Sequence, residues 1–413
     1  MVYFYWVIKL IEELENKYVE LLIDRCLSFV KEKALFIDYY DDNEAFVQKL
    51  VAKAKSRGID DIYLDKNNKE ERHRRLLQSV EEIENDDYFD DSIWDEYAKK
   101  NAAFLMMATE FPGYFDDIPS QNMNAANKKT RTSKPIFKEK QLMDEISWCI
   151  AVIPNELWAQ EKFPNLDAKS AYNEYFKLMC HCTMCDRENP IAAWDEFLDK
   201  QRQLVKKLNE LKITKMHYKN SLGTDLIIGL SPDAIWQCAG YEGSEVIVNM
   251  PTYEVFTSPD YRLTEGIVYA SRPLAYGGAL VDKFWVKFKD GKVVDYDAKV
   301  GKDILKGIIE SDPYSCFLGE CALVDKNTAI AQTNFVYGET CLDENASCHI
   351  ALGDGFPECM VGALEESAEE RRARGLNHSN NHVDFMIGTD DLNIIAETKD
   401  GEKLIFKEGG FNL

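Results

Sequence analysis

Apolar residues follow two different spacings in the first part of the chain. In residues 9–32 they recur three and four positions apart, which predicts an amphipathic helix. Residues 34–40 (ALFIDYY) and 60–65 (DDIYLD) are short apolar runs typical of strands, and residues 43–56 between them have helical spacing. Gly58 suits the C-terminal end of that helix. A strand, a helix and a strand in succession predict a parallel sheet.

The mixed pattern continues to about residue 210. Residues 102–108 and 147–154 predict two further strands, and helical spacing resumes over residues 168–211. Residues 81–96 are strongly acidic, which is typical of the solvated face of a helix. Residues 120–140 (SQNMNAANKKTRTSKPIFKEK) are polar and basic, and this composition favours a loop or linker.

The second half of the chain changes to the two-residue alternation of β-strands. Residues 283–297 and 393–406 each alternate on both sides of an Asp-Gly pair, which is a strong signal for a hairpin. The length of 413 residues also favours two domains over one. We therefore predict an α/β chain: an N-terminal α/β domain with a parallel sheet (1–210), followed by a β-rich α+β catalytic domain (211–413).

The net charge narrows the range of partners. With 49 Lys and Arg against 72 Asp and Glu, the formal charge is −23. This charge repels phosphate backbones and anionic lipid surfaces, so we expect neither nucleic acid nor membrane as a partner. It suits a metal cation or a protonated amine, although acidic surfaces also serve solubility alone.

The cysteines and the N-terminal segment indicate a cytoplasmic protein. The 11 cysteines are odd in number and scattered, as expected for free thiols in a reducing compartment. The cluster of Cys180, Cys182 and Cys185 has no matching second pair and lies in a helical pattern, which favours packing over a zinc site. The apolar start of the chain has no basic leader and no small-residue cleavage site, which argues against a signal peptide.

Histidines and carboxylates in the second half offer a candidate metal site. In the segment HVDFMIG, a strand would place His382 and Asp384 on one face and its apolar residues on the other. His349 follows in DENASCHIALG, while Glu254 and Glu320 stand in apolar or β-like surroundings. A buried carboxylate needs a metal ion or a basic partner, so a salt bridge remains the alternative for both glutamates. Mixed oxygen and nitrogen donors suit zinc, cobalt or manganese.

His378 and His382 lie four residues apart, as in a helical zinc motif. The intervening Ser-Asn-Asn is a poor helix former, and the glutamate that such a motif requires is missing. We therefore reject this reading, and the residues alone indicate a metal hydrolase of unknown substrate.

Several motifs in the second half, taken together, resemble one known family. The sequence is similar to the aminopeptidase T, or AmpS-type (PepS-like), metallo-aminopeptidases in its motifs GTDLIIGL, EVFTSP, TEG, GECALVD, DENASCHIALG and HVDFMIG, between residues 223 and 388. WAQEKFP (158–164) and AAWDEF (192–197) also resemble the family, whereas the likeness is faint before residue 145. The resemblance implies an exopeptidase that removes N-terminal residues from short peptides through a metal-activated water, and a homodimer.

The resemblance also implies the residues of the site. Two divalent metal ions would be bound by Glu254, Glu320, His349, His382 and Asp384, with Glu254 as the expected bridge between them. Glu265 in the TEG motif is a candidate general base, and the alternative is a carboxylate that holds a turn.

One position departs from the family pattern. The family usually has a tyrosine seven residues after the histidine of the DENA motif, and this chain has Phe356. The ring at this substrate-binding position is kept, while the hydroxyl that would stabilise the transition state is lost. Two alternatives therefore stay open: a metal-binding protein with weak or no peptidase activity, and a dinuclear hydrolase that acts on another amide.

Overall fold

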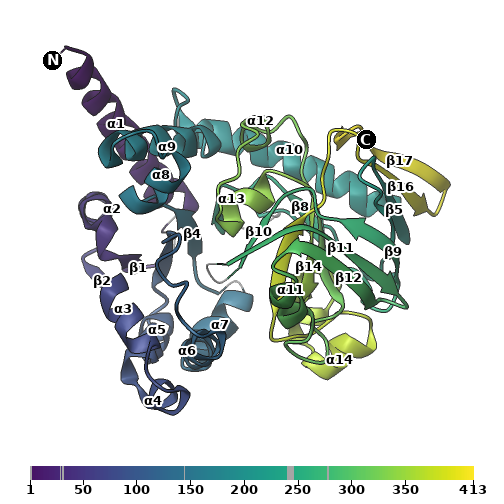
Figure 1. The fold of residues 1–413 in the computed structure, drawn as a ribbon. Coiled ribbons are helices and arrows are strands. Elements are labelled where there is room, and N and C mark those ends of the chain that lie inside the picture. The colour runs from purple at the N-terminus through teal and green to yellow at the C-terminus, as the bar shows by residue number, and fades with distance from the viewer. Residues whose placement is uncertain (1, 28, 30–31, 144, 240–245, 277–278) are drawn as a thin grey trace. The chain divides into compact units, whose positions relative to one another are not determined.

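The structure is a computed structural model that describes residues 2–27, 29, 32–143, 145–239, 246–276 and 279–413. The chain forms two compact units (Figure 1). The first comprises Met1–Asp195 and Gly243–Pro251, and the second comprises Glu196–Glu242 and Thr252–Leu413. The division falls inside helix α10 (Pro190–Leu211). The functional domain boundary near residue 210 stays a prediction.

The first unit is built on a five-stranded parallel sheet, in the order β2-β1-β3-β4-β7. The predicted parallel sheet of the N-terminal half is therefore confirmed. Its strands are β1 (Ala34–Tyr40), β2 (Asp61–Asn67), β3 (Ala103–Ala108), β4 (Trp148–Val152) and β7 (Asn249–Met250).

Helices precede and connect these strands, in the alternating order that the sequence pattern predicts. They are α1 (Val2–Leu21) with a π-helical turn (Leu22–Cys26), α2 (Glu44–Ser56), α3 (Lys69–Leu76), α4 (Val80–Asn85), α5 (Ser92–Lys99), α6 (Ser120–Thr132), α7 (Pro135–Leu142), α8 (Glu156–Lys162) and α9 (Ala168–Cys182), with short 3-10 turns at Asp41–Asn43 and Asp87–Phe89. Helices α2 and α5 both pack against β1.

The prediction of a loop over residues 120–140 is wrong. The segment forms most of α6 and α7, because a few apolar side chains anchor an otherwise polar sequence. Ala125 and Ala126 are buried in one cluster with Leu76, and Phe137 is buried in another. Polar composition alone therefore does not exclude a helix, because a surface helix buries only one apolar stripe and exposes the rest of its residues.

The second unit contains two antiparallel sheets. The larger has nine strands among the described residues, in the order β10-β11-β9-β6-β5-β16-β17-β18 with β12 paired to β11. Its strands are β5 (Lys215–Lys219), β6 (Asp225–Gly229), β9 (Thr264–Tyr269), β10 (Leu274–Tyr276), β11 (Ala279–Lys289), β12 (Lys292–Val300), β16 (Asn393–Thr398), β17 (Gly401–Lys407) and β18 (Gly410–Phe411). Both predicted Asp-Gly hairpins are present, as β11–β12 and β16–β17.

The smaller sheet has the order β15-β14-β13-β8. Its strands are β8 (Val255–Thr257), β13 (Leu318–Leu323), β14 (His349–Gly353) and β15 (His382–Met386). Besides α10, the second unit contains the helices α11 (Lys302–Ile309), α12 (Ala329–Gln332), α13 (Thr340–Asn345) and α14 (Ala368–Ala373). It also has 3-10 turns at Pro357–Cys359 and Ala363–Glu365. Side chains of both sheets share one hydrophobic core, to which the small sheet contributes Cys321, Ile350, Leu352 and Phe385. The opposite face of the small sheet is the subject of the next subsection.

No helix in the described part of the chain is both long enough and apolar enough to cross a bilayer.

Candidate metal centre

One face of the small sheet carries the charged residues that the sequence singled out. Glu320 pairs with Ala351 on β14, and Ala351 pairs with Asp384 on β15, so these three residues share a face. His349 and His382 lie two residues before Ala351 and Asp384, and therefore point to the same side. Residues with the opposite phase enter the hydrophobic core. The alternation predicted for HVDFM is thus present.

Glu254 reaches the same face from the other edge of the sheet. It precedes β8 and lies two residues before Phe256, which pairs with Ala322 on β13. The loop that carries Glu254 is fixed from two sides. Gln201 of α10 donates to the carbonyl of Glu254 at 3.2 Å, and the backbone N–H of Tyr253 donates to the side chain of Asn345.

The five side chains form two groups that share one residue. Within each group, the potential ligand atoms all lie within 4.8 Å of one another. One group is Glu254, Glu320 and His349, and the other is Glu320, His382 and Asp384. His349 Nε2 lies 2.9 Å from Glu254 Oε2, and His382 Nε2 lies 3.2 Å from Glu320 Oε2 and 3.4 Å from Asp384 Oδ2. Glu320 belongs to both groups, whereas Glu254, the expected bridge, belongs to one.

Small residues on the middle strand make this cluster possible. Strand β14 lies between β13 and β15, so Glu320 and His382 meet above it. The partners of Glu320 and His382 on β14 are Ala351 and Gly353, which leave the space above the strand open.

Both imidazoles present the same nitrogen to the cluster. Nδ1 of His349 lies 3.0 Å from the carbonyl oxygen of Ser347, and Nδ1 of His382 lies 2.8 Å from that of Asp354. A carbonyl oxygen accepts only, so Nδ1 carries a proton and donates it. In the neutral ring, the lone pair is then on Nε2, which faces the carboxylates. This is the usual arrangement of a metal-binding histidine.

Burial and mutual charge perturb the ionisation of the cluster. Burial raises the pKa of Glu320 to about 7, against the opposing effect of its hydrogen bond with His382. Burial also raises the pKa of Asp384, but the charge and hydrogen bond of His382, together with His349 and Glu320, lower the value to about 2. For His349, burial lowers the pKa, but the hydrogen bond and charge of Glu254, together with the charges of Glu320 and Asp384, hold the value well above the usual range.

These side chains fit a divalent cation. Three carboxylates are buried together with a histidine that is only 1% exposed. Asp384 Oδ1 and Glu254 Oε2 are buried without a hydrogen-bond partner, although Glu254 Oε2 is close to His349. Buried carboxylates without hydrogen bonds are costly unless a cation binds them. The donor set of oxygen and imidazole nitrogen suits zinc, cobalt or manganese.

A further carboxyl group lies beside the cluster. Glu344, at the end of α13, is buried, and its pKa is raised well above the usual value by burial and then by the charges of Asp384 and Glu254. The sequence signal for it was its place in the DENA motif, but nothing in the pattern distinguished it from its neighbour Asp343. Asp343 instead accepts hydrogen bonds from the backbone N–H groups of Tyr337 and Gly338.

Phe356 lies against the candidate metal ligand His382. Its ring centroid is 4.9 Å from that of His382 and 5.4 Å from that of Phe256. Its backbone N–H donates to Ser258 Oγ at 2.8 Å, which ties the segment after β14 to the EVFTSP motif. The ring therefore borders the cluster at His382.

Glu265 lies in the other sheet. It is exposed on β9, and its carboxylate accepts a hydrogen bond of 2.6 Å from the backbone N–H of Asp290 in the β11–β12 turn. This contact matches the turn-holding alternative, and a catalytic role for Glu265 stays a prediction.

Known proteins share both the sequence and the fold of this chain. The family model of the thermophilic metalloproteases (M29) matches residues 11–411. Aminopeptidase AmpS of Bacillus subtilis is 32% identical over 401 residues, which cover 96% of this chain and 98% of that protein. Aminopeptidase T of Thermus thermophilus is 34% identical over 309 residues, covering 74% and 75%.

The solved structure of wild-type AmpT from Thermus thermophilus superimposes with a TM-score of 0.87 at 28% identity, covering 97% of this chain and 99% of that one. The likeness therefore includes the N-terminal half, where the sequence motifs were faint. From the matching family model and the relatives at 30% identity or more, the chain belongs to the thermophilic metalloprotease (M29) family.

Proposed function

We propose that this protein is a metal-dependent aminopeptidase whose two divalent ions are bound by Glu254, Glu320, His349, His382 and Asp384. The observation that carries the proposal is the position of Glu320, which belongs to both three-residue groups. A carboxylate shared by two groups suits a pair of ions, because its two oxygens can bind one ion each. The names of the relatives support peptide hydrolysis over metal binding without activity.

The shared position changes the expected bridge. One ion would be held by Glu254, Glu320 and His349, and the other by Glu320, His382 and Asp384. We therefore propose Glu320, in place of Glu254, as the bridging ligand. Zinc, cobalt and manganese all fit the donor set.

When bound, such a pair of ions supplies a water nucleophile near neutral pH and Lewis acidity toward the peptide carbonyl. The protein contributes the geometry. The backbone carbonyls of Ser347 and Asp354 keep the two imidazoles oriented. The burial of Glu254, Glu320 and Asp384 limits the contact of these side chains with bulk water.

The substrate class is proposed from the names of the relatives. Two divalent ions would offset the charges of Glu254, Glu320 and Asp384, so the charge of these carboxylates does not select the substrate. We propose short peptides with a free N-terminus as the substrates, in keeping with the names of the relatives. The homodimer and the cytoplasmic location belong to the proposal as predictions from the resemblance and the sequence.

Hydrolysis of leucyl-p-nitroanilide by metal-stripped protein tests the proposal. Zinc, cobalt or manganese is added back to the wild type, to His382→Ala and to Glu265→Gln. We expect metal-dependent turnover that is lost in His382→Ala and kept in Glu265→Gln. Wild-type protein that binds two ions and cleaves no aminoacyl amide contradicts the aminopeptidase. Loss of turnover in Glu265→Gln would restore Glu265 as a candidate general base.

A further inference from the structure

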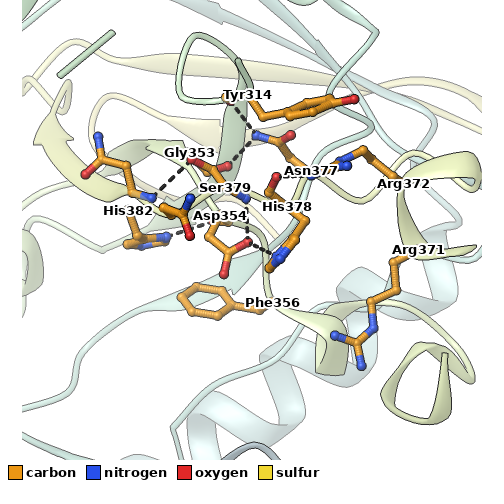
Figure 2. Close-up of polar contacts among 12 residues, drawn as sticks. Tyr314, Gly353, Asp354, Phe356, Arg371, Arg372, Asn377, His378, Ser379 and His382 are labelled. Carbon is orange, nitrogen blue, oxygen red and sulfur yellow. Dashed lines mark hydrogen bonds and ion pairs between the residues drawn. The ribbon is translucent and has the colours of Figure 1, made fainter. Parts of the chain in front are cut away.

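The metal-facing histidine of β15 depends on a residue that lies outside the cluster. His382 Nδ1 donates to the backbone carbonyl of Asp354, at 2.8 Å, from the segment that follows β14 (Figure 2). The position of this one oxygen therefore sets both the tautomer of His382 and the direction of its Nε2.

Asp354 is itself held by the loop that leads into β15. Its Oδ1 lies 2.9 Å from His378 Nδ1 and accepts from the N–H of Ser379 at 3.0 Å (Figure 2). Its own N–H donates to the carbonyl of Asn381 at 2.6 Å. Asp354 thus contacts His378, Ser379, Asn381 and His382, and we call this set of contacts the 354 clasp.

The backbone beside the clasp is packed closely. Gly319, at the β-bulge of β13, lies so near that a Cβ at this position would be 1.9 Å from the carbonyl oxygen of Asp354. That oxygen is the acceptor of His382 Nδ1–H. The preceding carbonyl, of Gly353, accepts from Asn377. The acceptor oxygen is therefore confined by the backbone of β13 as well as by the clasp.

The other histidine is supported differently. His349 bonds to the carbonyl of Ser347, two residues away in the chain, and its side chain is 1% exposed. In the clasp, the side chains of Asp354 and His378 are 40% and 48% exposed, and that of His382 is 27% exposed. A surface pair of this kind adds little to stability. Its structural effect is local, on the position of residue 354.

We propose that Asp354 is a positioning residue for His382, and that only the Glu320–His382–Asp384 half of the centre depends on it. The inference rests on the proposed dinuclear site. It also gives a role to His378, a histidine of the NHSNNHVD segment that lies outside the ligand set. Partners that orient a ligand in this way typically change metal affinity by roughly 10- to 100-fold.

The test compares metal binding by the wild type, Asp354→Ala, Asp354→Asn and Asp312→Asn. Asp312 is the matched control, because its Oδ2 holds Ser379 and Asn380 of the same loop at 2.6 and 2.7 Å without bonding residue 354. Zinc binding to metal-stripped protein is followed by calorimetry, and cobalt binding by its visible absorption spectrum. Hydrolysis of leucyl-p-nitroanilide is measured as a function of metal concentration.

In Asp354→Ala, we expect one ion to bind as in the wild type and the second to bind about 10- to 100-fold more weakly. The cobalt spectrum should lose the component of the second ion, and excess metal should restore kcat without changing KM. Asp354→Asn retains an oxygen acceptor, so it should recover most of the affinity. Asp312→Asn should bind both ions normally.

Two results overturn the inference. One is wild-type affinity for both ions in Asp354→Ala and Asp354→Asn. The other is an equal loss of metal affinity in Asp312→Asn, because the effect would then come from folding of the loop. If Asp354→Ala does not fold, His378→Leu takes its place in the test, and wild-type affinity for the second ion in that variant overturns the inference. Failure of the aminopeptidase proposal gives a different result. A wild type that binds two ions without turnover contradicts that proposal, while the metal titrations of the variants still test the role of Asp354. A wild type that binds fewer than two ions overturns both proposals.

Discussion

His382 and Glu320 lie 3.2 Å apart, Nε2 to Oε2, although the strands that carry them are not neighbours. The two side chains meet above β14, over the small residues Ala351 and Gly353. The cluster is thus formed across three strands of one sheet, with β14 in the middle and Glu320 shared by both groups of side chains. This arrangement determines which substitutions should affect one ion and which should affect both.

Glu320→Gln should weaken the binding of both ions, since Glu320 belongs to both groups. The loss should exceed the roughly 10- to 100-fold that is typical of removing an outer partner of a ligand. Glu254→Gln and Asp384→Asn should each weaken mainly one ion. Zinc titration of the metal-stripped variants measures this, and a Glu320→Gln variant that retains one ion at wild-type affinity would assign the bridge to another residue.

Ala351→Val should impair metal binding more than folding. Ala351 lies between Glu320 and Asp384 on the cluster face, so added methyl groups would occupy space above β14. Overpacking of this kind costs about 1–3 kcal/mol of stability. Metal stoichiometry and thermal unfolding are measured together. An unchanged affinity for both ions would show that the space above β14 is not needed for the centre.

Phe356→Tyr should raise kcat for aminoacyl amides. The ring of Phe356 lies against His382, and the substitution restores the hydroxyl that the family usually has. One oxyanion donor is worth on the order of 100- to 1,000-fold in rate. Phe256→Tyr, at the neighbouring ring, is the control and should have no such effect. If Phe356→Tyr leaves kcat unchanged at saturating metal, another group already supplies the hydrogen bond.

Metal affinity should rise with pH between 6 and 8. Burial raises the pKa of Glu320 to about 7, and the pKa of His349 is held well above its usual range against the effect of burial, so protons compete with metal in this interval. Calorimetry in buffers of different ionisation enthalpy should show proton release on binding. Equal affinities at pH 6 and pH 8 would contradict the ionisation described for the cluster.

The metal-free protein should show the opposite trend in stability. In the folded protein the pKa of Glu320 is about 7, above its usual value. Its contribution to the free energy of unfolding is therefore fully present below about pH 4.5 and is lost as the pH rises to about 7. The folded pKa of Asp384, about 2, is depressed, and its contribution is lost only below about pH 4. Denaturant midpoints in chelator should therefore fall from pH 5 to pH 7.5. Glu320→Gln should flatten this slope.

The sequence predicted those parts of the molecule that follow from short-range patterns. The alternation in HVDFM placed His382 and Asp384 on one face, and the Asp-Gly pairs placed both hairpins. Glu254 and Glu320 could be identified as candidate ligands because carboxylates are unusual in apolar surroundings. The resemblance then joined these residues into one set.

Features that depend on the pairing of strands far apart in the sequence could not be predicted from the sequence. The shared position of Glu320 arises because β14 lies between β13 and β15, and no local pattern encodes that order. The support of His382 by Asp354 is a backbone contact, to which side-chain identity gives no signal. The helices over residues 120–140 depend on the burial of Ala125, Ala126 and Phe137 in clusters formed with other segments.

Strand β8 is three residues long and lies at the edge of the small sheet, and Glu254 precedes it directly. On its outer side it is held only by the paired backbone hydrogen bonds between Phe256 and Gln237 and by the bond from Thr257 Oγ1 to the carbonyl of Ile235, among the described residues. An ion bound between Glu254 and β13 would add a cross-link there, so metal loss would loosen this edge of the sheet. Depletion of metal in the cell would then shorten the lifetime of the protein through proteolysis at this edge, in addition to halting its chemistry.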